Sequence, residues 1–273
     1  MTRFSAIESR PAAQWRIGQA GVEAIVRDLP DETAVGISYD GRPHVVLMAT
    51  PTHVEELAVG FTLSERIAPL SAIRGVTVTE QDEGVQVDLQ LTIDARREMA
   101  RARTLAGRSS CGLCGVQQLK QAVRPVPAVT GGLRVGRQAI QRALAALETE
   151  QALGRLTRAM HAAAWADASG LLLMVREDVG RHNALDKLVG GGLRAGLDPS
   201  AGFVVLTSRC SFEMVEKAAV AGFPMIVAIS APTALAIRKA EEADITLVAL
   251  ARADGHAVFT RPDRIVEVET VPA

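Results

Sequence analysis

The chain has 273 residues, of which 48% are hydrophobic and 22% are charged. This balance is typical of a folded protein and excludes a disordered chain. The 30 basic and 31 acidic residues leave a net charge of −1, so no basic footprint indicates a nucleic-acid partner. The apolar runs are too short to cross a bilayer, and the first 15 residues lack the apolar core of a signal peptide. We therefore expect a cytoplasmic protein without a membrane partner.

The first half of the chain is predicted to form a mixed, largely antiparallel lobe. The Asp40-Gly41 turn favours a hairpin, and an alternation of apolar and polar residues further on favours a strand with one buried face. Strands are expected over residues 34–39, 45–48 and 85–93. A helix is expected over residues 53–66, because Thr52 is a good N-cap and Glu55 completes a capping box with it.

The second half of the chain alternates short apolar runs with helical segments. Strands are expected over residues 171–175, 203–206, 225–229 and 245–250, and helices over residues 181–195, 212–221 and 234–242. This alternation predicts a mostly parallel sheet covered by helices, which binds ligands at the carboxyl ends of its strands. A stretch rich in proline and glycine lies near residue 130, so we divide the chain there into two lobes, residues 1–130 and 131–273.

Three cysteines are present, and two of them, Cys111 and Cys114, form a C-x-x-C pair that glycines flank and split. Five arginines precede the pair within residues 96–108, and nearby cations lower a thiol pKa and favour the nucleophilic thiolate. The pattern favours reactive thiols, with half of a zinc site or two incidental cysteines as alternatives. A structural zinc site takes four ligands, and the chain has no second C-x-x-C. Cys210 is expected to be a small buried residue.

Three polar turns follow predicted strands and precede predicted helices, at residues 178–183, 207–211 and 230–233. Helix N-termini present free N–H groups, so turns gathered at one sheet edge favour a ligand that carries phosphates. The first turn adds further donors from Arg181, His182, Asn183 and Lys187. The alternative is simple helix capping by Asp178 or Asn183. In that case Asp186 and Lys187 lie at the surface.

One pattern resembles a different kind of metal site. His53 and Glu55, followed by Cys111 and Cys114, match the H-x-E and C-x-x-C signature of zinc deaminases. Ser110 stands where that signature has proline, and Glu55 already has a role in the expected capping box. Both points argue against zinc deamination, so we expect no metal ion held by the protein.

Taken together, these motifs resemble those of the formate dehydrogenase accessory sulfurtransferase family, FdhD. The resemblance covers roughly residues 20 to 265. It rests on Leu105–Arg108 leading to Cys111–Gly115, His161–Trp165, Glu177–Lys187, Ser211–Met214 with Lys217, and Ser230–Thr233. In that order and spacing the motifs are far more specific than an isolated C-x-x-C.

The resemblance implies a sulfurtransferase that takes persulfide sulfur from a cysteine desulfurase. The sulfur is passed to the molybdenum bis(molybdopterin guanine dinucleotide) cofactor of formate dehydrogenase. Cys111 is the implied persulfide carrier, and Cys114 is expected to resolve or relay the persulfide. The resemblance also implies a cytidine-deaminase-like α/β/α domain with a mostly parallel sheet, beside the smaller N-terminal lobe, and lobes of this kind suggest a homodimer. The alternatives are a dithiol oxidoreductase or redox sensor, and a non-catalytic carrier of the cofactor.

The cofactor-binding residues follow partly from the resemblance and partly from the polar turns. The resemblance assigns the segment Leu250, Ala251, Arg252, Ala253, Asp254 and Gly255. We expect the site to be completed by His161, Arg181, His182, Ser208, Ser230 and Thr233. The chain departs from the family pattern at Leu250, where an aromatic residue is common, at Ala249, where glycine is common, and at residues 158–160, where glycine often precedes the histidine motif.

Overall fold

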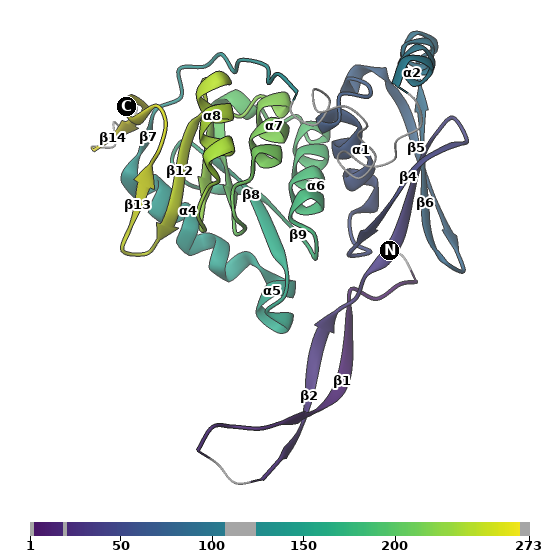
Figure 1. Ribbon diagram of the computed structural model, residues 1–273. Helices are drawn as coiled ribbons and strands as arrows, with labels where there is room; N and C mark the ends of the chain where they lie inside the picture. Colours follow the sequence, from purple (N-terminus) through teal and green to yellow (C-terminus); the bar gives the residue numbers. More distant parts are fainter. Residues whose placement is uncertain (1–2, 19–20, 107–123, 268–273) are drawn as a thin grey trace.

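The structure, a computed structural model, describes residues 3–18, 21–106 and 124–267, which form two lobes and a projecting arm (Figure 1). The arm is an antiparallel hairpin of β1 (Ile7–Gln14) and β2 (Glu23–Pro30), and most of its side chains are exposed. The sequence pattern does not predict this hairpin. A two-stranded ribbon without a buried face needs no alternation of apolar and polar residues, so no such signal marks it.

The N-terminal lobe is built on a four-stranded sheet with the order β4-β3-β6-β5. Its strands are β3 (Thr33–Tyr39), β4 (Arg42–Ala49), β5 (Ile73–Gln81) and β6 (Gly84–Leu91). The predicted hairpin of β3 and β4 and the predicted strand β6 are confirmed, whereas β5 was not predicted. The lobe is mixed as expected, because β6 pairs in parallel with β3 while the other two pairs are antiparallel. Helix α1 (Val54–Ser64) packs on the buried face of this sheet, and α2 (Ile93–Ala106) follows β6.

The start of α1 shows that the expected capping box is wrong. The N-cap is His53, which lies in the left-handed region with φ 53° and makes no side-chain capping hydrogen bond. Thr52 is half-buried, and its Oγ1 atom has no hydrogen-bond partner in the described part of the chain. Glu55 instead forms an ion pair at 3.1 Å with an arginine of the second lobe. The turn before α1 is instead held by a contact with the second lobe. The backbone N–H of Thr50 donates to Asp178 at 3.1 Å, and this contact overrides the capping pattern of the local sequence.

The second lobe contains a six-stranded sheet with the order β13-β12-β11-β10-β8-β9. Its strands are β8 (His161–Asp167), β9 (Leu172–Asp178), β10 (Gly202–Leu206), β11 (Met225–Ala228), β12 (Thr246–Arg252) and β13 (Gly255–Val258). Only β10–β11 and β11–β12 are parallel pairs, so the expectation of a mostly parallel sheet is wrong. Two strands were not predicted, β8 and β13, and both run antiparallel to their neighbours. β8 is rich in alanine, a residue that strands disfavour.

Helices cover both faces of this sheet, as the α/β/α part of the prediction requires. α6 (Arg181–Arg194), α7 (Phe212–Ala221) and α8 (Ala234–Glu242) pack on one face, and α4 (Arg137–Glu150) packs on the other. The predicted ranges of α6, α7 and α8 are confirmed, whereas α4 was not predicted. The rings of Trp165 and Phe223 meet edge to face in the larger core, with centroids 4.4 Å apart. The assignment to the cytidine-deaminase-like fold stays a prediction.

Small elements complete the second lobe. They are the helix α5 (Ala152–Thr157) and the two-residue parallel pair of β7 (Val135–Gly136) and β14 (Ile265–Val266). Two 3-10 helices, η2 (Pro199–Ala201) and η3 (Pro262–Arg264), also belong to this lobe. A third, η1 (Leu70–Ala72), belongs to the first lobe. The boundary predicted near residue 130 falls in the irregular segment 124–134 and stays a prediction. None of the helices in the described ranges has the length and apolar character needed to span a membrane.

The two lobes pack through α1 and α6, which approach each other at two glycines. A Cβ atom at Gly60 would lie 1.8 Å from the backbone oxygen of Asp186, and one at Gly190 would lie 2.0 Å from the backbone oxygen of Glu56. Only glycine therefore permits this approach. Lys217 of α7 adds contacts across the lobes, because its Nζ atom donates to the hydroxyl of Ser64 at 2.8 Å and forms an ion pair with Glu65 at 3.1 Å. The N-terminal lobe is thus firmly attached to the helices that begin at the candidate site.

Candidate functional site

The three polar turns meet at one edge of the six-stranded sheet. Strands β9, β10, β11 and β12 all end there, and β8 begins there because it runs antiparallel to β9 and β10. Backbone hydrogen bonds tie the turns together, from Thr207 to Ala162, from Cys210 to Ala231, and from Leu250 to Ser230. The predicted convergence of the turns is confirmed. We call this edge, formed by residues 178–183, 207–211, 230–233 and 250–255 with His161, the polar edge.

Arg181 and His182 open α6 at the polar edge and meet a carboxylate from α7. The Nε2 atom of His182 lies 2.9 Å from Oε2 of Glu213, and the same oxygen lies 4.0 Å from a guanidinium nitrogen of Arg181. The hydrogen bond with His182 lowers the pKa of Glu213, so this carboxylate is ionised at neutral pH. All three side chains are partly exposed, between 24% and 34%, so a ligand can reach them.

One feature of this cluster favours an anionic ligand, and a neighbouring histidine adds a neutral hydrogen-bonding group. The Nε atom of Arg181 is buried and has no hydrogen-bond acceptor among the described residues, so one donor of the guanidinium is unused. A buried donor without an acceptor costs free energy that an anionic oxygen would recover. Burial lowers the pKa of His161, and the charge of Arg181 lowers it further. His161 is therefore neutral at physiological pH and contributes hydrogen bonding rather than charge.

Two other residues of the first turn are not available to a ligand, contrary to the prediction. Lys187 is fully buried, and its Nζ atom lies 2.6 Å from Oδ2 of Asp178 and donates to the backbone oxygen of Thr50 at 2.9 Å. Asn183 is also buried and donates to the backbone oxygen of Met48 and to Asp178. The alternative that placed Asp186 and Lys187 at the surface is likewise wrong. These groups instead join the polar edge to the end of β4.

The second and third turns combine capping with partly accessible hydroxyls. The Oγ1 atom of Thr233 accepts a hydrogen bond from the backbone N–H of Ala236 at 3.2 Å, so Thr233 caps α8. Ser208 is buried, and its hydroxyl donates to the backbone oxygen of Arg209 at 3.0 Å. Ser230 is half-buried and Thr233 is exposed. Of the three predicted hydroxyls, the structure therefore presents Ser230 and Thr233 to solvent and withholds Ser208.

The segment assigned to the cofactor turns from β12 into β13 at the polar edge. Leu250 lies in the left-handed region with φ 53°, within a bulge between Ala249 and Arg252. This backbone conformation is uncommon for a branched side chain, and bulges often re-aim side chains beside functional sites. Leu250 is accordingly exposed, as are Arg252, Ala253 and Asp254, and Gly255 is half-buried. Ala251 is buried in the core, so this residue of the predicted segment is not available to a ligand.

The cysteine pair Cys111 and Cys114 lies outside the described residues. The third cysteine is confirmed as a core residue, because Cys210 is fully buried. Burial raises the pKa of its thiol to about 12. Cys210 is therefore neither a nucleophile nor a metal ligand at neutral pH.

We expect native alkylation to modify at most two of the three cysteines. Iodoacetamide reacts with thiolates, and the buried thiol of Cys210 forms almost none at neutral pH. The intact mass after labelling should show no third adduct, and a third should appear once the protein is unfolded in guanidinium. Labelling of Cys210 in the folded protein would contradict the burial described above.

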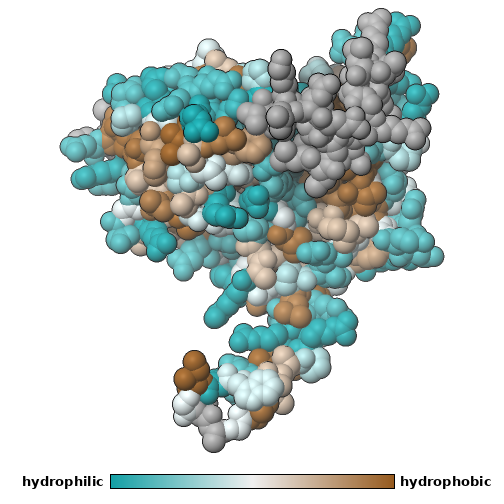
Figure 2. Space-filling view, viewed as in Figure 1, coloured by the Kyte–Doolittle hydropathy of each residue, from teal (hydrophilic) through white to brown (hydrophobic). Residues whose placement is uncertain are grey.

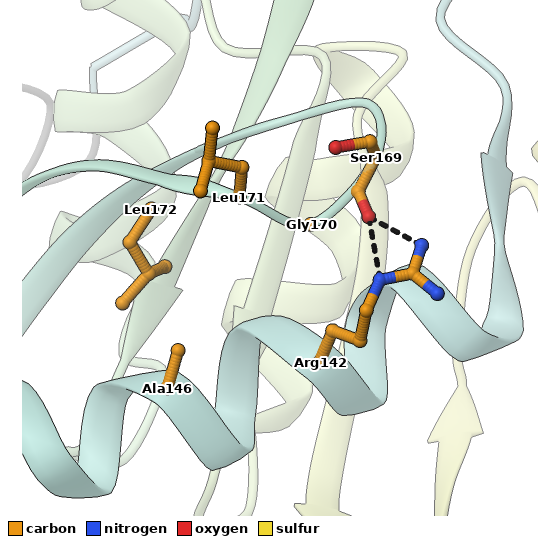
Figure 3. Close-up of a pocket in the computed structure, with 6 residues that line it drawn as sticks. All are labelled: Arg142, Ala146, Ser169, Gly170, Leu171 and Leu172. Atoms are coloured by element: carbon orange, nitrogen blue, oxygen red, sulfur yellow. Dashed lines mark hydrogen bonds between the residues drawn. The ribbon is translucent and has the colours of Figure 1, made fainter.

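A separate cavity of about 330 Å³ lies between α4 and the turn from β8 to β9 (Figure 3). The guanidinium of Arg142 donates to the backbone oxygen of Ser169 there, and Leu171 and Leu172 form its apolar wall. This turn lies at the opposite end of β8 from His161, about 20 Å away for a strand of this length. The cavity is therefore not part of the polar edge.

Comparison with known proteins gives consistent matches along the chain. The family model of the FdhD/NarQ family matches residues 30–266. A relative from Bordetella petrii, named sulfur carrier protein FdhD, is 44% identical over 237 residues, or 86% of this chain and 85% of that protein. A relative of the same name from Agrobacterium fabrum is 47% identical over 244 residues, or 88% of this chain and 90% of that protein.

A solved structure shares the fold. It is described as a formate dehydrogenase accessory protein from Desulfotalea psychrophila, and it matches with a TM-score of 0.74 over 96% of this chain and 100% of that chain. At 23% identity this likeness shows the fold alone. The molecule is thus a two-lobed α/β protein in which three polar turns meet at one sheet edge, and its sequence carries a C-x-x-C pair. By the family match over residues 30–266, the chain belongs to the FdhD/NarQ family.

Sequence reasoning missed Glu213 as a member of the cluster and missed the burial of Lys187. A signal for the second was present, because Asp186 and Lys187 stand between the apolar pairs Ala184-Leu185 and Leu188-Val189. Apolar residues at consecutive positions spread around the circumference of a helix, and this pattern indicates a helix buried on all sides rather than one with a single apolar stripe. No comparable signal marks Glu213, because its partner lies 31 positions away in the sequence.

Proposed function

We propose that this protein is a sulfur carrier that serves a formate dehydrogenase. Membership of the FdhD/NarQ family carries the proposal, because the matched range includes Cys111 and Cys114. Two relatives are named sulfur carrier protein FdhD, and the similar solved structure is described as a formate dehydrogenase accessory protein. In this proposal the donor is a cysteine desulfurase. The acceptor, bound as a substrate, is the molybdenum bis(molybdopterin guanine dinucleotide) cofactor.

Sulfur loading is proposed at Cys111. Its thiolate attacks the terminal sulfur of the donor's cysteine persulfide, so that a new S–S bond forms on Cys111. The donor's S–S bond breaks and its cysteine leaves as a thiolate, with no net oxidation. For delivery, the Cys114 thiolate attacks the inner sulfur of the loaded Cys111, a Cys111–Cys114 disulfide forms, and the terminal sulfur leaves as sulfide. A cellular thiol then reduces the disulfide and restores both thiols.

This proposal is tested by sulfur transfer in vitro. The desulfurase is supplied with sulfur-labelled cysteine, and the label is followed onto cofactor-bearing formate dehydrogenase. Transfer should depend on the wild-type carrier and should disappear with Cys111→Ala. Equal transfer by that variant, or transfer without any carrier, would show that Cys111 does not carry the sulfur.

The cofactor is proposed to bind at the polar edge, with its phosphates on the turns that open α6, α7 and α8. The unused Nε donor of Arg181 and the positive ends of three helices favour anions there. Leu250 projects an apolar surface at the same edge, which suits the face of a guanine base. Arg252 is the one cation of the segment 250–255 and is exposed, so it is our choice for a phosphate contact.

Arg252→Ala is expected to weaken the binding of GDP, a fragment of this cofactor, by roughly 10- to 150-fold. A hydrogen bond to a charged group contributes about 1.5–3 kcal/mol, which corresponds to that range. Calorimetric titration measures the change. Arg74→Ala is a matched control, because Arg74 is exposed on β5 of the other lobe and should leave binding unchanged. Wild-type affinity in Arg252→Ala would show that this contact is misplaced.

The proposal includes a cytoplasmic homodimer. Figure 2 shows hydrophobic side chains along the projecting arm, and Trp15, Ile17 and Val26 are more than 70% exposed. A two-stranded ribbon is only marginally stable alone in water, so a covering partner would stabilise it. Light scattering should give the mass of two chains, and the mass of one chain at micromolar concentration would contradict the dimer.

A further inference from the structure

Glu213 is an unexpected group in a site that binds anions. Its carboxylate is ionised and partly exposed at the polar edge, where it repels phosphate. An acidic residue in the first turn of a helix also stabilises the helix dipole, and Glu213 is the second residue of α7. That role alone would be met by a carboxylate in contact with solvent. It does not require the contacts that Glu213 makes with another helix.

Those contacts join two turns of the polar edge. One oxygen of Glu213 accepts hydrogen bonds from Nε2 of His182 at 2.9 Å and from the Ser211 hydroxyl at 3.3 Å. The same oxygen lies 4.0 Å from Arg181, so the first two residues of α6 face one acceptor on α7. A hydrogen bond from Nε2 also decides which nitrogen of the neutral imidazole carries the proton.

We propose that Glu213 is a positioning residue that holds His182, and with it Arg181, in the orientation that binds a phosphate of the ligand. The inference rests on the proposed cofactor site at the polar edge. Glu213 acts through its hydrogen bond rather than through contact with the ligand, which a carboxylate would repel. The contact between α6 and α7 therefore orders two donors before the ligand arrives, which reduces the entropy lost on binding.

Three variants separate this role from the alternatives. Glu213→Ala removes the hydrogen bond, and we expect it to weaken GDP binding about tenfold, the equivalent of one such bond. Glu213→Gln keeps an acceptor for Nε2, so its affinity should remain within about threefold of wild type. Glu216→Ala is the control, because it removes a carboxyl group from the same helix at a site near Arg124 and Lys239. It should bind GDP as wild type does.

A double-mutant cycle tests whether Glu213 acts through His182. If it does, Glu213→Ala should have little further effect on GDP affinity in a His182→Ala background. Tighter binding by Glu213→Ala would show simple repulsion of the ligand, and additive losses would show an independent role. Loss of affinity in Glu213→Gln equal to that in Glu213→Ala would also overturn the proposal.

The nitrogen-15 spectrum of the His182 imidazole gives a readout that needs no ligand. At a pH where the ring is neutral, the wild type and Glu213→Gln should carry the proton on Nε2, and Glu213→Ala should show a mixture of tautomers. An unchanged tautomer in Glu213→Ala would contradict the positioning role. Failure of the wild type to bind GDP would instead overturn the proposed cofactor site, and this inference with it. Equal GDP binding by the wild type and Glu213→Ala would overturn this inference alone.

Discussion

Cys111→Ala is expected to abolish maturation of the client formate dehydrogenase while leaving the fold and nucleotide binding intact. Removal of the thiol leaves no acceptor for the donor's sulfur, whereas the polar edge is built entirely from other residues. Formate dehydrogenase activity in a strain whose only copy carries the variant measures the effect. Circular dichroism and GDP titration of the purified variant separate loss of chemistry from loss of folding.

Cys210→Ala is the matched control for this experiment. Its thiol is fully buried, with a pKa of about 12, so it takes no part in thiolate chemistry. Strains with this variant should keep client activity near the wild-type level. Normal client activity in the Cys111→Ala strain would remove Cys111 from the proposed route.

Lys187→Met is expected to lower the free energy of unfolding by about 3–5 kcal/mol. The Nζ atom of Lys187 lies 2.6 Å from Asp178, and neither side chain has any exposed surface. Removal of the ammonium group leaves the Asp178 carboxylate buried without its partner. The same ammonium group also donates to Thr50, so the variant loosens the contact between the lobes. Urea denaturation followed by circular dichroism measures the change.

Two further variants identify the cause of that loss. Asp178→Asn together with Lys187→Met removes both charges and should recover part of the stability, because no unpaired charge then remains. Arg238→Met, at an exposed position on α8, should change the unfolding free energy by less than about 0.5 kcal/mol. An unfolding free energy of Lys187→Met equal to that of the Arg238→Met control would mean that the ion pair contributes no stability.

The parts of the fold that could be predicted from the sequence are those in which local pattern and burial agree. The apolar runs of β10, β11 and β12 lie in the sheet centre, and the helices between them begin at polar turns. Strand β8 was missed because His161–Asp167 is mostly alanine, which gives no strand signal. The capping box at Thr52 failed because the contact between Thr50 and Asp178 sets the turn instead.

The candidate site was predicted in outline and not in detail. Polar residues after successive strands place the turns at one edge, because strands of equal direction end together. Which polar residues remain accessible depends on the N-terminal lobe, whose strand β4 buries Asn183 and Lys187. The partnership of His182 with Glu213 depends on how α6 and α7 pack. The burial of Lys187 leaves a mark in the local sequence, in the apolar pairs on either side of Asp186 and Lys187, whereas the partnership of His182 with Glu213 leaves none.

The mass of the intact protein after incubation with a cysteine desulfurase and cysteine tests the central claim most directly. Each chain should gain the mass of one sulfur atom, and dithiothreitol should remove it. The gain should be largest in Cys114→Ala, which cannot form the Cys111–Cys114 disulfide that releases the sulfur, and it should be absent in Cys111→Ala. Loss of two protons in the wild type together with no added sulfur in Cys114→Ala would instead indicate a dithiol oxidoreductase, and an equal gain in Cys111→Ala would contradict the account.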